Sequence, residues 1–425
     1  MRLLFISLAA AMAFPARAGI SLDECMARAE ENYPAIAQYD IATRSASVAL
    51  SDINRGWLPR VEIYAQSTLQ NDIPSWPDAL GNMLAAMNQN FRGLSRFQYK
   101  AGVDVTQTVW DGGASRASRR VERASELVKK ASVDVEMYAV KERVQNLFFS
   151  ILLMERQIDL TRRSLALLEA NHSRLEAMVK NGTAMKSDAA MVEAQILATH
   201  QKLSEADAAL GSYRRMLSIL TGMETVDAQL DMPAADMPAD DTPERPELQL
   251  LDLRSRLNEA MLSRRDAAVM PRIGFFAQAY YGYPGLNYFE SMMKRDMSFN
   301  ILGGLKLSWN IDSFYTRSNS RRATALQQES LQADRETFLL NNRMLSTQQR
   351  QQIDALREVM ATDSRIVELR AEVRRAAESQ LANGIIDTTA LLAKITEENQ
   401  ARLTEQYHQI QLIQQIYQLR HTLNR

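Results

Sequence analysis

Apolar and polar residues alternate with a period of two in four segments of the chain, which predicts four β-strands. The segments cover residues 61–69, 99–109, 273–283 and 299–311. In each segment the mainly apolar face falls on odd-numbered residues. The even-numbered face carries polar and charged residues, among them Glu62, Gln66, Lys100, Asp104, Arg272 and Lys306. Each strand is therefore expected to have one apolar and one polar face.

Long helices are predicted after the second and the fourth strand. No proline occurs from Gly113 to Lys180, and apolar residues there recur in alternating three- and four-residue steps, as in a coiled-coil seam. From Leu331 to Val373 apolar residues recur at heptad spacing, interrupted only by Gln352. At about 1.5 Å per residue, such helices approach a length of about 100 Å.

Two Asn-Gly pairs predict the ends of these helices. Asn181-Gly182 and Asn383-Gly384 both tolerate the left-handed backbone that commonly ends a helix before the chain reverses. Each long helix is therefore expected to turn back into a second one, forming a helical hairpin.

The order of elements occurs twice. Residues 57–61 (WLPRV) are echoed by residues 269–273 (VMPRI), and the two Asn-Gly pairs correspond in the same way. The landmarks keep one offset on each side of a single length change between residues 70 and 100. We therefore predict an internal duplication in which each repeat contains a helix, two strands and a long helical hairpin. The predicted boundaries are a first repeat over 19–223, a linker rich in Asp, Ala and Pro over 224–246, and a second repeat over 247–425.

The N-terminal residues predict a signal peptide over residues 1–18. Arg2 is followed by an apolar run from Leu3 to Phe14 and then by residues 16–18 (ARA), a small-x-small cleavage pattern. The apolar run is shorter than the roughly 20 residues that span a bilayer. We therefore expect the mature protein to leave the cytoplasm. The single cysteine, Cys25, excludes an internal disulfide framework.

Composition excludes several classes of function. The 425 residues include only 16 Gly and 11 Pro, as in a protein of long helices, and 50 basic residues nearly balance 51 acidic ones. This balance does not provide the basic field that nucleic-acid binding requires. The four histidines stand apart without metal-ligand spacing. We therefore expect no catalytic residues, no metal, no cofactor and no enzymatic activity.

The predicted strands need further copies of the chain to form a closed structure. Open sheet edges would leave backbone donors and acceptors unpaired in hydrocarbon, so four strands cannot span a membrane alone. An outward apolar face and an inward polar face describe a barrel with a water-filled lumen, built from several identical chains. The helices carry too much charge for lipid and are expected to lie in the periplasm.

These features together resemble the TolC-like outer-membrane efflux protein (OEP) family. The resemblance rests on the element order, the duplication, Leu58-Pro59 before a strand, the segment 109–113 (VWDGG) before a helix, and the Asn-Gly turns. It covers essentially the whole mature chain. It implies a mainly α fold with membrane β-structure, in the cell outer membrane with the helical part in the periplasm. It also implies a homotrimer, with four strands from each protomer in a twelve-stranded transmembrane β-barrel and the coiled-coil helices in a periplasmic α-barrel.

The resemblance also implies a function and partners. Such a protein is the outer-membrane channel of a tripartite efflux or type I secretion system, a passive export duct for drugs, small toxic molecules or secreted protein. Its partners are outer-membrane lipid, a periplasmic adaptor (membrane fusion protein) and an inner-membrane pump of the resistance-nodulation-division or ABC type. The residues expected to contact the adaptor at the hairpin tips are Asn181, Gly182, Thr183, Asn383, Gly384 and Ile385.

The resemblance further places a periplasmic constriction near these tips. Asp188 falls where relatives carry a carboxylate, although it could equally cap the helix that begins there. Ile386 stands where some relatives carry an arginine. We therefore predict an apolar closure that includes Ile386, in place of a charged latch.

One alternative function stays open on the sequence. A periplasmic coiled-coil adaptor or tether without a membrane barrel would share the helices and the signal peptide. Strand alternation also occurs in sheets of soluble proteins that are buried on one face. An adaptor would normally carry a small β-rich binding domain between its helical arms, whereas this chain carries duplicated amphipathic strand pairs.

Overall fold

The computed structural model describes residues 19–75, 77–87, 93–234 and 236–425, so the predicted signal peptide lies outside the described residues. The chain forms two compact units. Among the described residues, the helical unit comprises the chain up to Tyr39, Ala131–Leu250 and Asp334–Arg425, and the sheet unit comprises Asp40–Lys130 and Leu251–Ala333. Each unit takes segments from both halves of the sequence.

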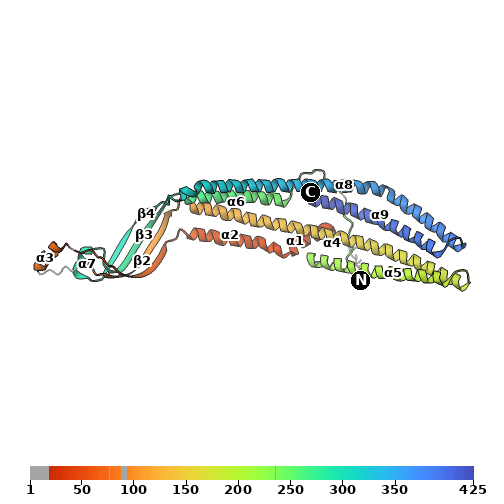
Figure 1. Ribbon diagram of the computed structural model, residues 1–425, viewed down its shortest axis with the longest axis horizontal. Coiled ribbons are helices and arrows are strands. Elements are labelled where there is room, and N and C mark those ends of the chain that lie inside the picture. Colours follow the sequence, from red (N-terminus) through yellow and green to blue (C-terminus); the bar gives the residue numbers. More distant parts are fainter. Residues whose placement is uncertain (1–18, 76, 88–92, 235) are drawn as a thin grey trace, which may run out of the picture. The chain divides into compact units, whose positions relative to one another are not determined.

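The elements follow the predicted order (Figure 1). Those of the first half are α1 (Leu22–Asn32), the 3-10 helix η1 (Pro34–Ile36), α2 (Ala37–Arg55), β1 (Arg60–Leu69), α3 (Asp78–Ala86), β2 (Phe97–Trp110), α4 (Ala114–Lys180) and α5 (Lys186–Thr221). Those of the second half are α6 (Pro246–Ala268), β3 (Arg272–Tyr283), α7 (Tyr288–Lys294), β4 (Ser298–Ser308), α8 (Ser313–Ala382) and α9 (Thr388–Leu423). The sequence from α2 to α5 thus has the same order of elements as the sequence from α6 to α9.

Two local features differ from the expectation. The loop between each pair of strands contains a short helix, α3 in the first and α7 in the second. The last strand ends at Ser308, before Trp309 and Ile311, which we expected to continue it. The indole Nε1 of Trp309 donates a hydrogen bond of 2.9 Å to the carbonyl of Val269, so this residue is held by the loop before β3.

The four strands form one antiparallel sheet in the order β1-β2-β3-β4 (Figure 1). Apart from a bulge on β2, where Trp110 lies opposite Ile273, the register joins odd residues to odd residues and even to even. Ile63 lies opposite Val103, and Val103 lies opposite Ala279 on the next strand. Because side chains alternate between faces along a strand, this register brings all four apolar sets to one side of the sheet.

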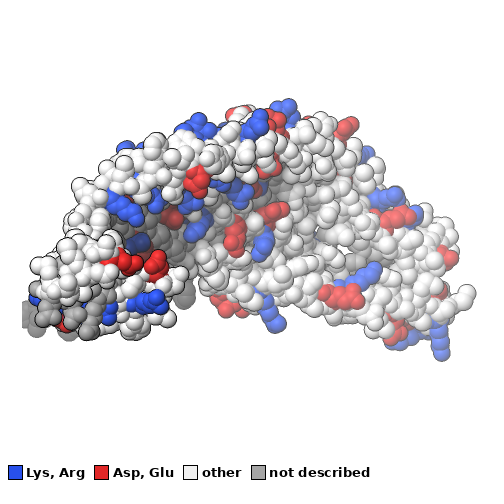
Figure 2. Space-filling model, turned by 60° about the vertical axis from the view of Figure 1, so that its left-hand side comes forward, with Lys and Arg blue, Asp and Glu red and all other residues white. Residues whose placement is uncertain are grey.

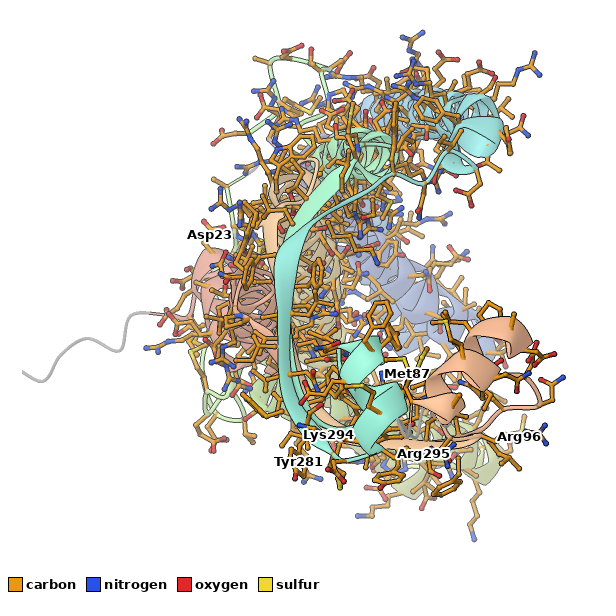
Figure 3. The ribbon with its side chains drawn as sticks, turned by 90° about the vertical axis from the view of Figure 1, so that its left-hand side faces the viewer. Asp23, Met87, Arg96, Tyr281, Lys294 and Arg295 are labelled. Carbon is orange, nitrogen blue, oxygen red and sulfur yellow. The ribbon has the colours of Figure 1, made fainter. Side chains whose placement is uncertain are left out.

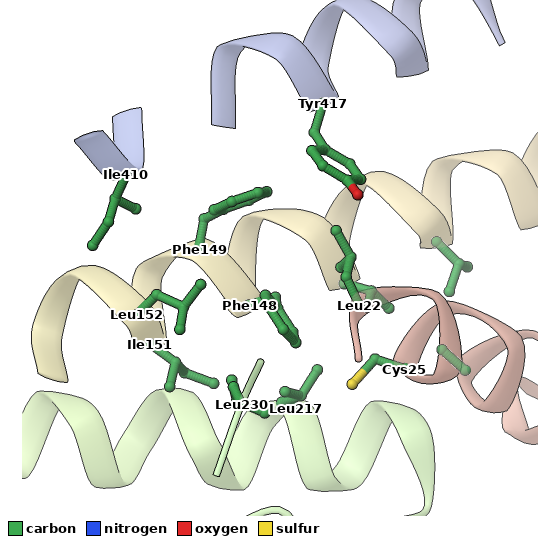
Figure 4. Close-up of a cluster of buried hydrophobic side chains, with 13 residues drawn as sticks. Leu22, Cys25, Phe148, Phe149, Ile151, Leu152, Leu217, Leu230, Ile410 and Tyr417 are labelled. Carbon is green, nitrogen blue, oxygen red and sulfur yellow. The ribbon is translucent and has the colours of Figure 1, made fainter. Parts of the chain in front are cut away.

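The helical unit has its main core where α1, α4, α5 and α9 meet. Figure 4 shows Phe148 and Phe149 of α4 among residues of the other helices. Both rings are fully buried, and burial of such a side chain contributes about 1.5–3 kcal/mol. Cys25 is also fully buried there, and burial raises the pKa of its thiol to about 12. Cys25 therefore acts as a packed apolar side chain in this core.

No helix among the described residues is long and apolar enough to cross a membrane.

Candidate functional site

The odd-numbered face of the sheet exposes large apolar side chains along all four strands. Ile63 is 82% exposed and Leu305 is 72% exposed. The other large members of this face are Val61, Leu69, Phe97, Tyr99, Phe275, Tyr281, Phe299, Ile301 and Leu307. Soluble proteins rarely leave so extended an apolar patch in contact with water, so this face is expected to contact an apolar environment.

The even-numbered face of the same sheet is mainly polar, with Phe276 and Leu302 as apolar exceptions. The register places Glu62 opposite Asp104, and the Nε2 of Gln278 donates a hydrogen bond of 2.8 Å to the Asp104 carboxylate. The Lys100 ammonium lies 5.7 Å from the ring centre of Tyr64 and 5.4 Å from that of Tyr280. Such distances allow attraction between the cation and both aromatic faces. The predicted division into an apolar and a polar face is therefore confirmed.

Both outer strands of the sheet have an open edge within the described chain. β1 pairs only with β2, and β4 pairs only with β3. An unpaired edge presents a row of backbone donors and acceptors that can bind another strand. The sheet is thus able to join further strands on both sides.

The two strand-connecting loops contact each other at one end of the sheet. The Nε of Arg295 in the second loop donates a hydrogen bond of 3.2 Å to the carbonyl of Gly93 in the first loop. Figure 3 views the protein from the end where these loops lie and labels Met87 of the first loop and Arg295 of the second. The described parts of the two loops are therefore joined by a hydrogen bond.

The predicted adaptor-contacting tips are two turns with the same backbone geometry. In the first, the N–H of Thr183 donates to the carbonyl of Met178 and that of Gly182 to the carbonyl of Val179. In the second, Ile385 donates to Gln380 and Gly384 to Leu381 in the same pattern. Gly182 and Gly384 have φ angles of 74° and 70°, as the left-handed residue of this helix ending requires.

The structure brings the two tips together in the helical unit. A cluster of buried side chains joins all four helices: Leu168, Leu175, Val192, Ala377, Leu381, Leu391 and Ile395. The hydroxyl of Thr389 on α9 lies 3.5 Å from the sulfur of Met191 on α5. Residues 181–183 and 383–385 thus belong to neighbouring hairpins, which the sequence alone did not require.

The predicted constriction residues have unlike surroundings. Asp188 is half-buried, and its carboxylate accepts a hydrogen bond of 3.0 Å from the N–H of Met185, so it caps the start of α5. Ile386 packs against the cluster at the tips, whereas the adjacent Ile385 is 71% exposed. Ile385 is therefore more accessible to another molecule than Ile386. The constriction formed by Asp188 and Ile386 stays a prediction.

Sequence reasoning missed a buried ion-pair network close to the tips. Glu398 of α9 is almost fully buried and accepts hydrogen bonds from Arg374 of α8 and Arg402 of α9. Burial raises the pKa of Glu398, but the two guanidinium groups outweigh it, so the pKa lies below its ordinary value. A sequence signal did exist, because Glu398 follows the apolar positions Leu391 and Ile395 at helical spacing.

A second missed cluster attaches the predicted linker to the end of α9. The N–H of Glu244 donates to the carbonyl of Leu423, and Asn424 donates back to the carbonyl of Glu244 over 2.7 Å. Beside them the His421 and Tyr138 rings stack with their centres 4.2 Å apart. Burial, together with the charge of Arg245, lowers the pKa of His421 to about 4. His421 is therefore neutral at neutral pH.

Charges of both signs are interspersed on the visible face of the protein (Figure 2). No group of three or more His, Cys, Asp or Glu residues in the described ranges is placed to hold a metal ion. The candidate functional features described above are surfaces: an apolar sheet face, a charged sheet face and the paired helical tips.

A four-stranded sheet with one apolar and one polar face, joined to long helical hairpins, defines the class of fold. Comparison with solved structures identifies the fold more closely. No protein-family profile matches the chain, and no curated protein is significantly similar in sequence. The outer membrane protein VceC of Vibrio cholerae superposes with a TM-score of 0.70 at 10% identity, covering 95% of this chain and 95% of that chain. The CmeC outer membrane channel of Campylobacter jejuni gives 0.67 at 12% identity, covering 95% and 85%.

The MtrE outer membrane channel of Neisseria gonorrhoeae, in its open state, gives a TM-score of 0.66 at 14% identity and covers 95% of this chain and 88% of that chain. Such low identities establish the fold alone. The chain therefore has the TolC-like fold that the sequence predicted.

Proposed function

We propose that the protein is an outer-membrane efflux channel. One observation carries the proposal: a single four-stranded sheet has a continuous exposed apolar face, a charged opposite face and two open edges. Lipid contact suits the apolar face, a water-filled lumen suits the charged face, and pairing between copies suits the edges. The likeness to outer membrane channels of other bacteria supports the same function.

The proposed assembly is a homotrimer with a twelve-stranded transmembrane β-barrel. Three sheets joined β4 to β1 would satisfy every open strand edge. The helices would form an α-barrel in the periplasm, and the tips would meet a periplasmic adaptor coupled to an inner-membrane pump. The exposed Ile385 and the equivalent geometry of the two tips support this contact. In this proposal the channel exports drugs, small toxic molecules or secreted protein passively.

Conductance of the purified full chain in a planar lipid bilayer tests the channel function. We expect discrete openings of uniform size from the wild-type chain. Pairs of cysteines, one in β1 and one in β4, test the assembly when several registers around Ile63 and Ile301 are tried, because only neighbouring copies can bring these two edge strands together and barrel closure staggers the strands. A disulfide-linked trimer is expected from at least one of these double variants and none from any single variant. Absence of both conductance and cross-links would contradict the channel.

The tether function makes the opposite prediction in a membrane extraction. A periplasmic tether without a barrel is released from membranes by carbonate, whereas a barrel stays until detergent is added. We expect retention in carbonate. The exposed apolar sheet face favours this result.

A further inference from the structure

The charged face of the sheet contains a hollow lined by three basic side chains from three different strands. Arg60 of β1, Arg272 of β3 and Lys306 of β4 line one depression of about 340 Å³. All three are even-numbered and exposed, and the register sets Gly274 opposite Lys306 and Arg272 opposite Ser308. Residues far apart in the sequence thus present positive charge to one space.

The floor of this hollow is kept open by a glycine. Gly274 lies between Thr108 and Lys306 in one cross-strand row, so no side chain rises from the middle of that row. The hydroxyls of Thr108 and Ser308 also line the hollow. It therefore offers hydroxyl donors as well as cations, which are the groups that bind phosphate and carboxylate oxygens.

The three cations have no carboxylate partner among the ion pairs of the described residues. Elsewhere in the sheet unit, both Arg317 and Arg321 bind the carboxylate of Asp266 over 3.0 Å. No acidic side chain of the described chain lines the hollow. The nearest acidic row on this face holds Glu62 and Asp104, and Asp104 already accepts from Gln278. Positive charge therefore predominates at the hollow, although Glu62 lies one same-face step from Arg60 on β1.

We propose that this hollow is an anion-binding station that favours small cargo bearing phosphate, sulfate or carboxylate groups. The assignment rests on the proposed channel function, since only then does the charged face line a lumen. In a trimer the hollow occurs three times around the lumen, and low-dielectric walls strengthen the attraction for anions. The cations are exposed and the hollow is open, so binding is weak enough for release, as conduction requires. Lipid phosphates are a less suitable ligand, because the apolar face lies on the other side of the sheet.

Calorimetric titration of the detergent-purified full chain with pyrophosphate tests anion binding at the station. This measurement does not require an open pore. The variant R60Q/R272Q/K306Q is expected to weaken binding at least about tenfold, because each lost charged hydrogen bond accounts for that much. The matched control R264Q/R265Q/R322Q removes three exposed cations from helices of the same unit and should bind as the wild type does. Wild-type binding should also weaken as salt is added.

A second measurement links the station to transport. In a bilayer with a salt gradient, the wild-type reversal potential should indicate anion preference, and R60Q/R272Q/K306Q should shift it toward cations while the control does not. Equal pyrophosphate binding by both variants, or none by the wild type, overturns the station. Binding that requires anionic lipid would assign the cations to headgroups and also overturns it. Pyrophosphate binding without any conductance would instead contradict the channel function, but it would still support anion binding at the hollow.

Discussion

Arg374 on α8 and Glu398 on α9 form a hydrogen-bonded ion pair in which only 17% of the arginine and 6% of the glutamate side chain is exposed. Arg402 donates to the same carboxylate over 2.9 Å. Removing one partner of a buried pair leaves uncompensated charge inside the protein. This network therefore holds the second hairpin together close to its tip.

Replacement of Glu398 by alanine should destabilise the helical unit by about 3 kcal/mol, because two guanidinium groups lose their shared carboxylate. Thermal unfolding followed by circular dichroism measures the effect. The adjacent Glu397→Ala removes a more exposed carboxylate and serves as the matched control, with little change in midpoint expected. Equal midpoints for the two variants would show that the buried pair does not stabilise the hairpin.

Acid should destabilise the helical unit through His421. Its pKa is about 4 in the folded protein against an ordinary 6.5, so the unfolded chain binds the proton first as the pH falls. The contribution of His421 to the free energy of unfolding is fully present above pH 6.5. It decreases by up to about 3 kcal/mol as the pH falls to about 4. His421→Gln should reduce this slope in denaturant titrations over that range, and His200→Gln, at an exposed position, should preserve it. An unchanged slope in His421→Gln would contradict the assignment.

A charge on the apolar sheet face should impair assembly in the membrane. Ile301→Lys places an ammonium where lipid contact is proposed, which costs about 2–4 kcal/mol at the bilayer midplane. Heat resistance of the oligomer on gels and recovery in the outer-membrane fraction measure the loss. The control Gln66→Lys adds the same charge to the polar face. If both variants assemble as well as the wild type, the odd-numbered face does not contact lipid.

The tips should respond to substitutions in two different ways. Gly182→Ala adds a side chain at a φ of 74°, so it should destabilise the turn by about 1 kcal/mol, although no atom lies within 4 Å of the added carbon.

Ile385→Glu should leave the fold unchanged, because Ile385 is exposed, but should weaken binding of the adaptor. Purified adaptor and surface plasmon resonance measure binding. Normal adaptor affinity in Ile385→Glu would exclude this residue from the contact.

The predicted constriction is tested by single-channel conductance. Asp188→Ala and Ile386→Ala should each raise the conductance of the reconstituted channel if these residues narrow the entrance. Because Asp188 caps α5 and Ile386 packs in the tip cluster, unfolding midpoints are needed beside the conductance. Unchanged conductance in both variants, with folding intact, would remove both residues from the constriction.

Much of the fold follows from the sequence because it depends on local periodicity. The alternation from Val61 to Leu69 placed β1 and its apolar face, and the heptads beyond Gly113 placed α4. Side-chain direction along a strand or helix is set by the backbone geometry alone. The Asn-Gly pairs marked both helix ends correctly because few other residues adopt a positive φ easily.

Other features were decided only by the tertiary structure. Arg60, Arg272 and Lys306 share a hollow because of the strand register, and register between distant strands is a non-local property. Helical spacing indicated that Glu398 is buried, but its partner Arg374 could not be recognised, because that pairing depends on how α8 packs against α9. The sequence thus determined which face of each element is apolar, and packing determined which charged groups meet, because electrostatic pairing depends on distances that only the folded chain sets.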